Sequence, residues 1–164
     1  MSLLFLDRDG TLMHDVGYPR DPADVRLLSG AAEAVRALAA LGYVPAVVSN
    51  QSGVGRGRIA PAEAEAVHLR FVEQFAEAAG LVLPCSYCPH GPDDDCMCRK
   101  PKPGLLIATA QRLGLPIGRT SIMIGDKESD AAAGRAAGCG LNLRFRGDWA
   151  EMLEAIRSLT DGRS

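Results

Sequence analysis

The sequence predicts an α/β fold of three layers, in which a doubly wound parallel sheet is covered by helices on both faces. Apolar runs of strand length alternate along the chain with stretches of helical periodicity. Two of these runs, 3–6 and 121–124, end just before aspartates, at the edge of a parallel sheet where ligands usually bind. A chain of 164 residues suffices for one core, so we expect a single domain, 1–164, without a large cap.

The first half of the chain supplies two predicted strands and a helix between them. Residues 3–6 form the first strand, and the stretch 12–28, rich in Gly, Pro and Asp, is typical of a loop. Apolar residues at helical spacing predict a helix over 31–41, which Gly42 is suited to end. The run 44–48 is the second buried strand.

The second half continues the alternation of helices and strands. Pro61 suits the first turn of a long amphipathic helix. The predicted elements are, in order, a glycine-rich loop 53–57, a helix 62–79, a strand 84–87, a helix 105–113, a strand 121–124, a helix 128–137, a strand 139–143 and a helix 149–159. The polar tail 160–164 is expected to fray.

Composition excludes several functional classes. Hydrophobic residues make up 47% of the chain and charged residues 23%, which is ordinary for a soluble globular protein. The net charge of −2 predicts no binding to nucleic acid or to an anionic membrane. No apolar run approaches the ~20 residues of a membrane span, and no basic segment precedes the first apolar run as in a signal peptide. We therefore expect a cytoplasmic protein, and the aromatic content of 5% is compatible with a monomer.

Two aspartates, Asp7 and Asp9, follow the first strand and are themselves followed by Gly10 and Thr11. One carboxylate at such a place could attack phosphorus, which would divide the very slow hydrolysis of a phosphate monoester into two easier steps. The other could protonate the leaving oxygen and later deprotonate water. The alternatives are a calcium loop and a pair of turn aspartates.

Polar and cationic groups also follow later elements of the chain. Ser49, Asn50 and Gln51 end the second strand, where a hydroxyl and amides could bind the charged oxygens of a phosphoryl group; a turn rich in Asx residues is the alternative. Arg99 and Lys100 would suit a dianionic substrate, although most such pairs are solvated surface residues.

Asp126 follows the strand 121–124, so it and Asp7 would come from neighbouring strand ends and could hold Mg²⁺. The cation would offset the repulsion between an attacking carboxylate and a phosphate. Lys127 contacts the substrate in one interpretation and only Asp7 in another. Asp130 is either a group that supports the site from behind or simply a helix first-turn aspartate.

Cysteines and a histidine cluster in a short loop. Cys88, His90, Cys96 and Cys98 match a tetrahedral zinc site of three thiolates and one imidazole. All four ligand positions are filled, so this Zn²⁺ would be structural and could supply on the order of 10 kcal/mol of folding free energy. Cys85 is a possible competitor for Cys88 as a ligand.

Together these motifs resemble phosphohydrolases of the haloacid dehalogenase (HAD) superfamily, from about residue 4 to about 142. The resemblance rests on four motifs: Asp-x-Asp-Gly-Thr, Ser-Asn-Gln-Ser-Gly-Val, Cys-x-His…Cys-x-Cys-Arg-Lys-Pro and Gly-Asp-Lys. They are similar to the branch whose members act on heptose 1,7-bisphosphate or histidinol phosphate. The resemblance implies an HAD-like Rossmannoid fold with a minimal cap and a zinc-binding loop.

The resemblance also assigns roles. It implies that Asp7 is the nucleophile and Asp9 the acid and base, that Ser49 and Lys100 stabilise the phosphoryl group, and that Mg²⁺ is held by Asp7, Asp126 and the backbone carbonyl of Asp9. The candidate substrate contacts are Thr11, Asn50, Gln51, Arg56, Arg99 and Lys127.

The sequence leaves two substrates in competition. The string Asn-Gln-Ser-Gly followed by Arg-Gly, within 50–57, is typical of the heptose enzymes, whereas the short zinc loop is similar to the histidinol phosphatases. Arg56 and Arg99 could bind the second phosphate of a bisphosphate, while acids at 93–95 could bind cationic histidinol phosphate. We favour the bisphosphate. A zinc-containing binding module without catalytic activity is the alternative from another class.

Overall fold

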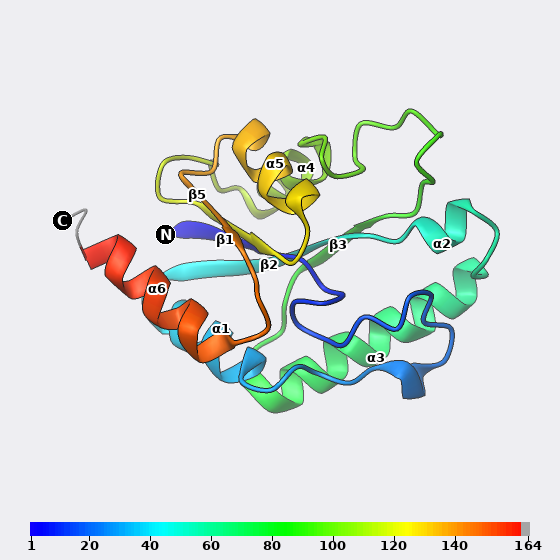
Figure 1. Ribbon diagram of the computed structural model, residues 1–164, viewed down its shortest axis with the longest axis horizontal. Helices are drawn as coiled ribbons and strands as arrows, with labels where there is room; N and C mark the ends of the chain where they lie inside the picture. The colour runs from blue at the N-terminus through cyan, green and yellow to red at the C-terminus, as the bar shows by residue number, and fades with distance from the viewer. Residues whose placement is uncertain (162–164) are drawn as a thin grey trace.

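The computed structural model describes residues 1–161, which form a five-stranded parallel sheet with helices on both faces (Figure 1). The strands follow the order β3-β2-β1-β4-β5, and every neighbouring pair is parallel. Their bounds are β1 Ser2–Leu6, β2 Tyr43–Asn50, β3 Cys85–Cys88, β4 Ile122–Gly125 and β5 Leu141–Arg144. The predicted three-layer, doubly wound sheet is confirmed.

Helices cover the two faces of the sheet unequally (Figure 1). On one face pack α1 (Ala31–Ala40), α3 (Pro61–Ala79) and α6 (Trp149–Asp161). On the other pack α4 (Gly104–Leu113) and α5 (Glu128–Ala137). A short helix, α2 (Ser52–Gly55), and a 3₁₀ turn, η1 (Pro22–Asp24), lie in the connections. None of the helices within residues 1–161 has the length and apolar character needed to cross a membrane.

Strand β1 explains why the opening apolar run has no polar member. Leu4 and Leu6 pack toward α1, α3 and α6, and Leu3 and Phe5 pack toward α4 and α5. All four side chains are fully buried, because successive residues of a strand point to opposite faces and both faces are covered. Each such side chain contributes about 1.5–3 kcal/mol on burial. The strand that precedes Asp7 is therefore a rigid support.

The predicted elements agree with the structure except at three places. The predicted strand 139–143 begins only at Leu141, because Cys139 N–H donates to Gly134 O at the end of α5 and Gly140 N–H donates to Gly118 O. The Cys139 side chain is buried nonetheless. The predicted loop 53–57 instead begins within the helical turn α2, whose last residue is Gly55.

The third difference is the predicted frayed tail, 160–164. Thr160 and Asp161 belong to α6, and the Thr160 hydroxyl donates to Ile156 O at 2.9 Å. This bond follows the helix back by one turn, so the helix continues through these polar residues. The remainder of the tail, 162–164, lies outside the described residues.

Candidate active site

Three strand ends meet where β1 lies between β2 and β4. Leu6 is in register with Val47 of β2 and with Ile124 of β4, and Asp7 N–H donates to Ile124 O at 2.9 Å. Residues that follow these positions therefore share one edge of the sheet. The sequence-predicted Asp7, Ser49 and Asp126 reach this edge from β1, β2 and β4, respectively.

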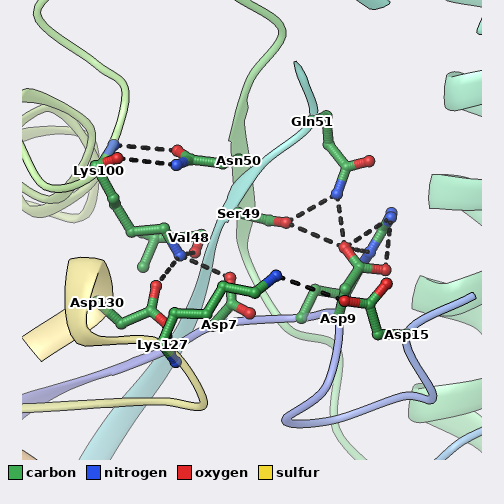
Figure 2. Close-up of polar contacts among 11 residues, drawn as sticks. Asp7, Asp9, Asp15, Val48, Ser49, Asn50, Gln51, Lys100, Lys127 and Asp130 are labelled. Carbon is green, nitrogen blue, oxygen red and sulfur yellow. Dashed lines mark hydrogen bonds and ion pairs between the residues drawn. The ribbon is translucent and has the colours of Figure 1, made fainter. Parts of the chain in front are cut away.

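Lys100 is the cation at the centre of the site, although it is 93 residues from Asp7 in the chain. Its ammonium Nζ lies 2.6 Å from Asp7 Oδ1 and 2.7 Å from Asp130 Oδ1, and it donates to Val48 O at 2.7 Å (Figure 2). These three acceptors match the three donors of an ammonium group. Burial would lower the pKa of Lys100, but the two carboxylates outweigh it and raise that pKa. The charge is therefore fixed in place.

Asn50 fixes the backbone that carries this lysine. Its Nδ2 donates to Lys100 O at 3.0 Å, and its Oδ1 accepts from Lys100 N–H at 3.0 Å (Figure 2). The sequence predicts the Asn50 amide to be a substrate contact. In the structure both polar atoms of that amide are engaged by Lys100, so the geometry gives Asn50 a supporting position.

Asp130 has both of the roles that the sequence left as alternatives. Its Oδ2 accepts from Lys127 N–H at 3.0 Å, as a carboxylate in the first turn of a helix does, while its Oδ1 pairs with Lys100. A side chain at Gly125 would come within 2.3 Å of Asp130 Oδ2, so glycine is required there. Asp130 thus gives the Lys100 ammonium a second carboxylate partner beside Asp7.

The carboxylates of Asp7, Asp126 and Asp130 offer oxygen atoms within 4.8 Å of one another. Burial raises the pKa of Asp7 to about 7, against the opposing effect of Lys100, and burial also raises the pKa of Asp126. Asp126 Oδ1 is buried and has no hydrogen-bond partner among the described residues. Such crowding of acids with an unpartnered oxygen suits a hard divalent cation such as Mg²⁺.

Gly10 allows the loop after Asp9 to approach this cluster. Its φ is +80°, and an added Cβ would lie 2.6 Å from Asp126 Oδ2. Both facts exclude a larger residue. The glycine of the Asp-x-Asp-Gly string therefore makes room for the carboxylate of Asp126.

Asp9 points away from Asp7 and Asp130, toward polar groups of the second strand end (Figure 2). Its Oδ2 accepts from Gln51 Nε2 at 2.7 Å and from the Ser49 hydroxyl at 3.4 Å. Gln51 Nε2 also donates to Ser49 Oγ at 2.8 Å. Arg8 pairs with both carboxylate oxygens of Asp9. The predicted acid-base residue and the predicted phosphoryl contacts therefore form one hydrogen-bonded group.

A pocket of about 300 Å³ opens beside this group. Its lining includes Asp9, Gln51 and Lys127, together with Asp15 and Tyr18, which sequence reasoning did not select. Lys127 Nζ and Asp15 Oδ2 are 3.4 Å apart. Asp15 and Tyr18 lie in the stretch that the sequence identified only as a loop; their nearness to the Asp-x-Asp string was the available signal.

Three predicted substrate contacts lie apart from this pocket. Arg99 lines a second pocket of about 450 Å³ beside the cysteine loop, and its guanidinium donates to His90 O at 3.4 Å. Arg56 is exposed on the turn after α2. The Thr11 side chain is fully buried, and its hydroxyl has no hydrogen-bond partner among the described residues.

The cysteine loop brings its four predicted ligands together. Cys88 Sγ lies 3.1 Å from Cys98 Sγ, 3.6 Å from Cys96 Sγ and 3.4 Å from His90 Nδ1. A tetrahedral zinc centre with bonds of about 2.3 Å needs sulfur atoms roughly 3.8 Å apart, so these residues fit Zn²⁺ after a small expansion. Cys85 is outside the group; its Sγ donates to Leu83 O at 3.4 Å.

Comparison with known proteins gives a consistent result. The family model of haloacid dehalogenase-like hydrolases matches residues 18–138. The D-glycero-beta-D-manno-heptose-1,7-bisphosphate 7-phosphatase of Pseudomonas putida is 41% identical over 84% of this chain and 79% of its own length. The enzyme of the same name from Vibrio cholerae is 34% identical over 87% of this chain and 80% of its own length.

A solved structure agrees with these relatives. The D,D-heptose 1,7-bisphosphate phosphatase of B. bronchiseptica, in complex with magnesium and phosphate, superposes with a TM-score of 0.83 at 30% identity. The match covers 96% of this chain and 99% of that one. From its motifs, its fold and these matches, the chain belongs to the haloacid dehalogenase-like hydrolase family.

Proposed function

We propose that this chain is a Mg²⁺-dependent D-glycero-beta-D-manno-heptose-1,7-bisphosphate 7-phosphatase that works through an aspartyl-phosphate on Asp7. The observation that carries the proposal is the buried contact of 2.6 Å between Lys100 Nζ and Asp7 Oδ1 at the edge of the sheet. The relatives from Pseudomonas putida and Vibrio cholerae support the choice of substrate.

Asp7 and Asp126 would hold the magnesium ion, with the backbone carbonyl of Asp9 as the third ligand that the family resemblance implies. The Oδ1 atom of Asp126, buried and without a hydrogen-bond partner within residues 1–161, supports this assignment. When bound, the cation offsets the repulsion between the Asp7 carboxylate and the anionic phosphoryl group. Lys100 contributes a second positive charge to the same place, and Asp130 keeps it there.

In the first step a carboxylate oxygen of Asp7 attacks phosphorus, and the bond from phosphorus to the O7 atom of the sugar breaks. The carboxyl proton of Asp9 passes to the leaving oxygen, so that an alcohol departs instead of an alkoxide. The Ser49 hydroxyl binds an oxygen of the phosphoryl group during transfer. Lys100 balances the negative charge beside the Asp7 carboxylate.

In the second step water attacks phosphorus of the aspartyl-phosphate, and the bond between phosphorus and the Asp7 oxygen breaks. The Asp9 carboxylate, now deprotonated, accepts the proton of the attacking water. Inorganic phosphate leaves, and Asp7 and Asp9 return to their starting protonation states. A single acid-base group near the pocket therefore serves both steps.

The two pockets support separate places for the two ends of a bisphosphate. The pocket with Asp15 and Tyr18 offers a carboxylate for sugar hydroxyls and an aromatic ring for the sugar face. The pocket that Arg99 lines would hold the second phosphate, with Arg56 on the neighbouring turn. The Thr11 side chain is fully buried, and both polar atoms of the Asn50 amide are engaged by Lys100, so these two residues would support the site instead of contacting a phosphate.

Histidinol phosphate remains the alternative substrate, and the acids of the zinc loop bear on it. Asp94 Oδ2 already accepts from Gly91 N–H at 2.6 Å, and Asp95 pairs with Lys102 at 2.8 Å. Asp95 is therefore paired with a cation and the Asp94 carboxylate is tied to the backbone of its own loop, so neither is free to turn toward a cationic substrate. This observation favours the bisphosphate.

The proposal also covers the domain organisation, cellular location, oligomeric state and structural metal of the enzyme. Residues 1–164 would act as one domain, as a cytoplasmic monomer, with a structural Zn²⁺ on Cys88, His90, Cys96 and Cys98. The net charge of −2 supports the absence of nucleic-acid and membrane partners. Size-exclusion chromatography with light scattering measures the mass in solution, and a dimer would contradict the monomer.

The test compares phosphate release from heptose 1,7-bisphosphate and histidinol phosphate in the presence of Mg²⁺. We expect a higher kcat/KM for the bisphosphate and no turnover by the Asp7→Asn variant. A higher kcat/KM for histidinol phosphate would assign the alternative substrate. No Mg²⁺-dependent release from either compound would favour a binding module instead of an enzyme.

A further inference from the structure

Arg8 is a buried cation that the proposed reaction does not use. The residue is 3% exposed, although arginine is seldom buried without a partner. Its position between Asp7 and Asp9 in the sequence places it at the centre of the catalytic string. Bringing a guanidinium into the protein interior costs free energy. The group that Arg8 pairs with there therefore indicates what the buried charge is for.

The partner is the Asp9 carboxylate, and Arg8 donates a hydrogen bond to each of its two oxygen atoms. Arg8 Nε lies 3.2 Å from Asp9 Oδ2, and Arg8 Nη2 lies 3.1 Å from Asp9 Oδ1. Two donors on one rigid plane fix both the position and the rotation of a carboxylate, which a single ammonium donor cannot do. The Asp9 side chain is still 14% exposed, so it also reaches the pocket.

Gln51 connects this ion pair to the phosphoryl contacts. Its Nε2 donates to Asp9 Oδ2 at 2.7 Å and to Ser49 Oγ at 2.8 Å (Figure 2). The bonds thus run from Arg8 through Asp9 and Gln51 to Ser49. A shift of the Asp9 carboxylate would also displace Ser49, because both residues accept a hydrogen bond from Gln51 Nε2.

We propose that Arg8 is a positioning residue for the acid-base carboxylate, an inference that rests on the role of Asp9 in the proposed function. An acid-base group must come within hydrogen-bond distance of the proton that it transfers. Arg8 holds Asp9 at one orientation before the substrate arrives, and Gln51 keeps that orientation in register with Ser49. Arg8 touches neither the substrate nor the transferred group.

The proposal predicts an effect that depends on the leaving group. An alkyl oxygen needs the proton of Asp9 as the ester bond breaks, whereas p-nitrophenolate is stable enough to leave without it. General acid catalysis contributes about 10²–10⁴-fold, so loss of its alignment has a large effect on alkyl phosphates alone. In Arg8→Met we expect kcat/KM for heptose 1,7-bisphosphate to fall roughly 10–100-fold, and kcat/KM for p-nitrophenyl phosphate to fall less than about 3-fold.

Two further variants complete the experiment. Arg8→Lys keeps the positive charge but loses the two coplanar donors of the guanidinium. It should therefore retain more activity on the alkyl phosphate than Arg8→Met, but less than the wild type. Arg70→Met is the matched control, since Arg70 pairs with Glu73 at 3.5 Å on the exposed side of α3 and should leave both substrates unaffected. If Arg8→Met does not fold, Arg8→Lys carries the test, with the same selective loss on a smaller scale.

Equal losses for the two substrates, or no loss for either, would overturn the proposal, because a merely structural role does not distinguish leaving groups. A crystal structure of the Arg8 variant adds a readout apart from activity. We expect the Asp9 carboxylate to leave its 2.7 Å contact with Gln51, and an unmoved carboxylate would count against the proposal.

Failure of the proposed function can be distinguished from failure of the proposed role of Arg8. A wild type that cleaves histidinol phosphate but not heptose 1,7-bisphosphate overturns the proposed substrate, and the leaving-group comparison is then made with histidinol phosphate. A wild type that cleaves no alkyl phosphate removes the acid-base role of Asp9 and the inference with it.

Discussion

Replacement of Asn50 tests how the site holds its central lysine. Asn50→Ala removes two hydrogen bonds to the Lys100 backbone, each 3.0 Å long. At about 1 kcal/mol for each neutral bond, we expect the free energy of unfolding to fall by about 2 kcal/mol. For a chain of this size that corresponds to a decrease in Tm of roughly 4–8 °C.

The effect on catalysis should be larger for kcat than for KM. Lys100 Nζ is 2.6 Å from Asp7, and a displacement of that ammonium weakens the charge balance where phosphorus is attacked. We expect kcat to fall roughly 10–100-fold with KM changed less than about 3-fold. The assay is steady-state phosphate release with Mg²⁺, together with thermal unfolding followed by circular dichroism.

Two further variants sharpen the interpretation. Asn50→Asp keeps the acceptor for Lys100 N–H but places a carboxylate oxygen against Lys100 O, so it should be at least as damaging as alanine. Ser2→Ala removes an exposed side-chain hydrogen bond of 2.9 Å to Thr120 and should change little. A rise in KM with unchanged kcat in Asn50→Ala would refute the reasoning, because it would mean that Asn50 binds substrate directly.

Three other predictions concern the charges and the metals. Lys100→Met leaves the buried Asp7 carboxylate without its cation, so we expect loss of turnover and, by chemical denaturation, a stability decrease of about 3–5 kcal/mol; wild-type stability would contradict it. Cys96→Ser should lower both the zinc content measured by mass spectrometry and the Tm, and unchanged values of the two would rule out the zinc site. Because burial raises the folded-state pKa of Asp7 from 3.8 to about 7, its stabilising contribution is fully present below pH 3.8 and disappears as pH rises through 7. Urea unfolding in magnesium-free buffer should therefore show a loss of stability between these values that Asp7→Asn lacks, and equal profiles would contradict the shift.

The sequence predicted the fold well where periodicity carried the information, and the structure brings together several of the candidate site residues that motif spacing selected. The apolar run before Asp7 predicted a strand buried on both faces, and the helix over 128–137 has the predicted bounds. The spacing of cysteines and a histidine in one short loop, from Cys88 to Cys98, indicated candidate zinc ligands, and the family resemblance favoured Cys88 over Cys85. Local signals of this kind need no knowledge of distant contacts.

The contacts that the sequence could not give are long-range ones. The direction of the Asn50 amide depends on a loop 50 residues later, and the place of Asp15 depends on Lys127, 112 residues away. Arg8 is the variable position of the Asp-x-Asp motif, and nothing local in the sequence shows that its guanidinium turns toward Asp9. Spacing identifies which residues gather, whereas tertiary packing decides what each side chain holds.

The measurement that tests the central claim most directly is mass spectrometry of protein acid-quenched during turnover of heptose 1,7-bisphosphate. The account predicts one added phosphoryl group on the peptide that contains Asp7 in the wild type, and none in the Asp7→Asn variant. Phosphate release without any phosphorylated Asp7 peptide, or continued turnover by Asp7→Asn, would contradict it.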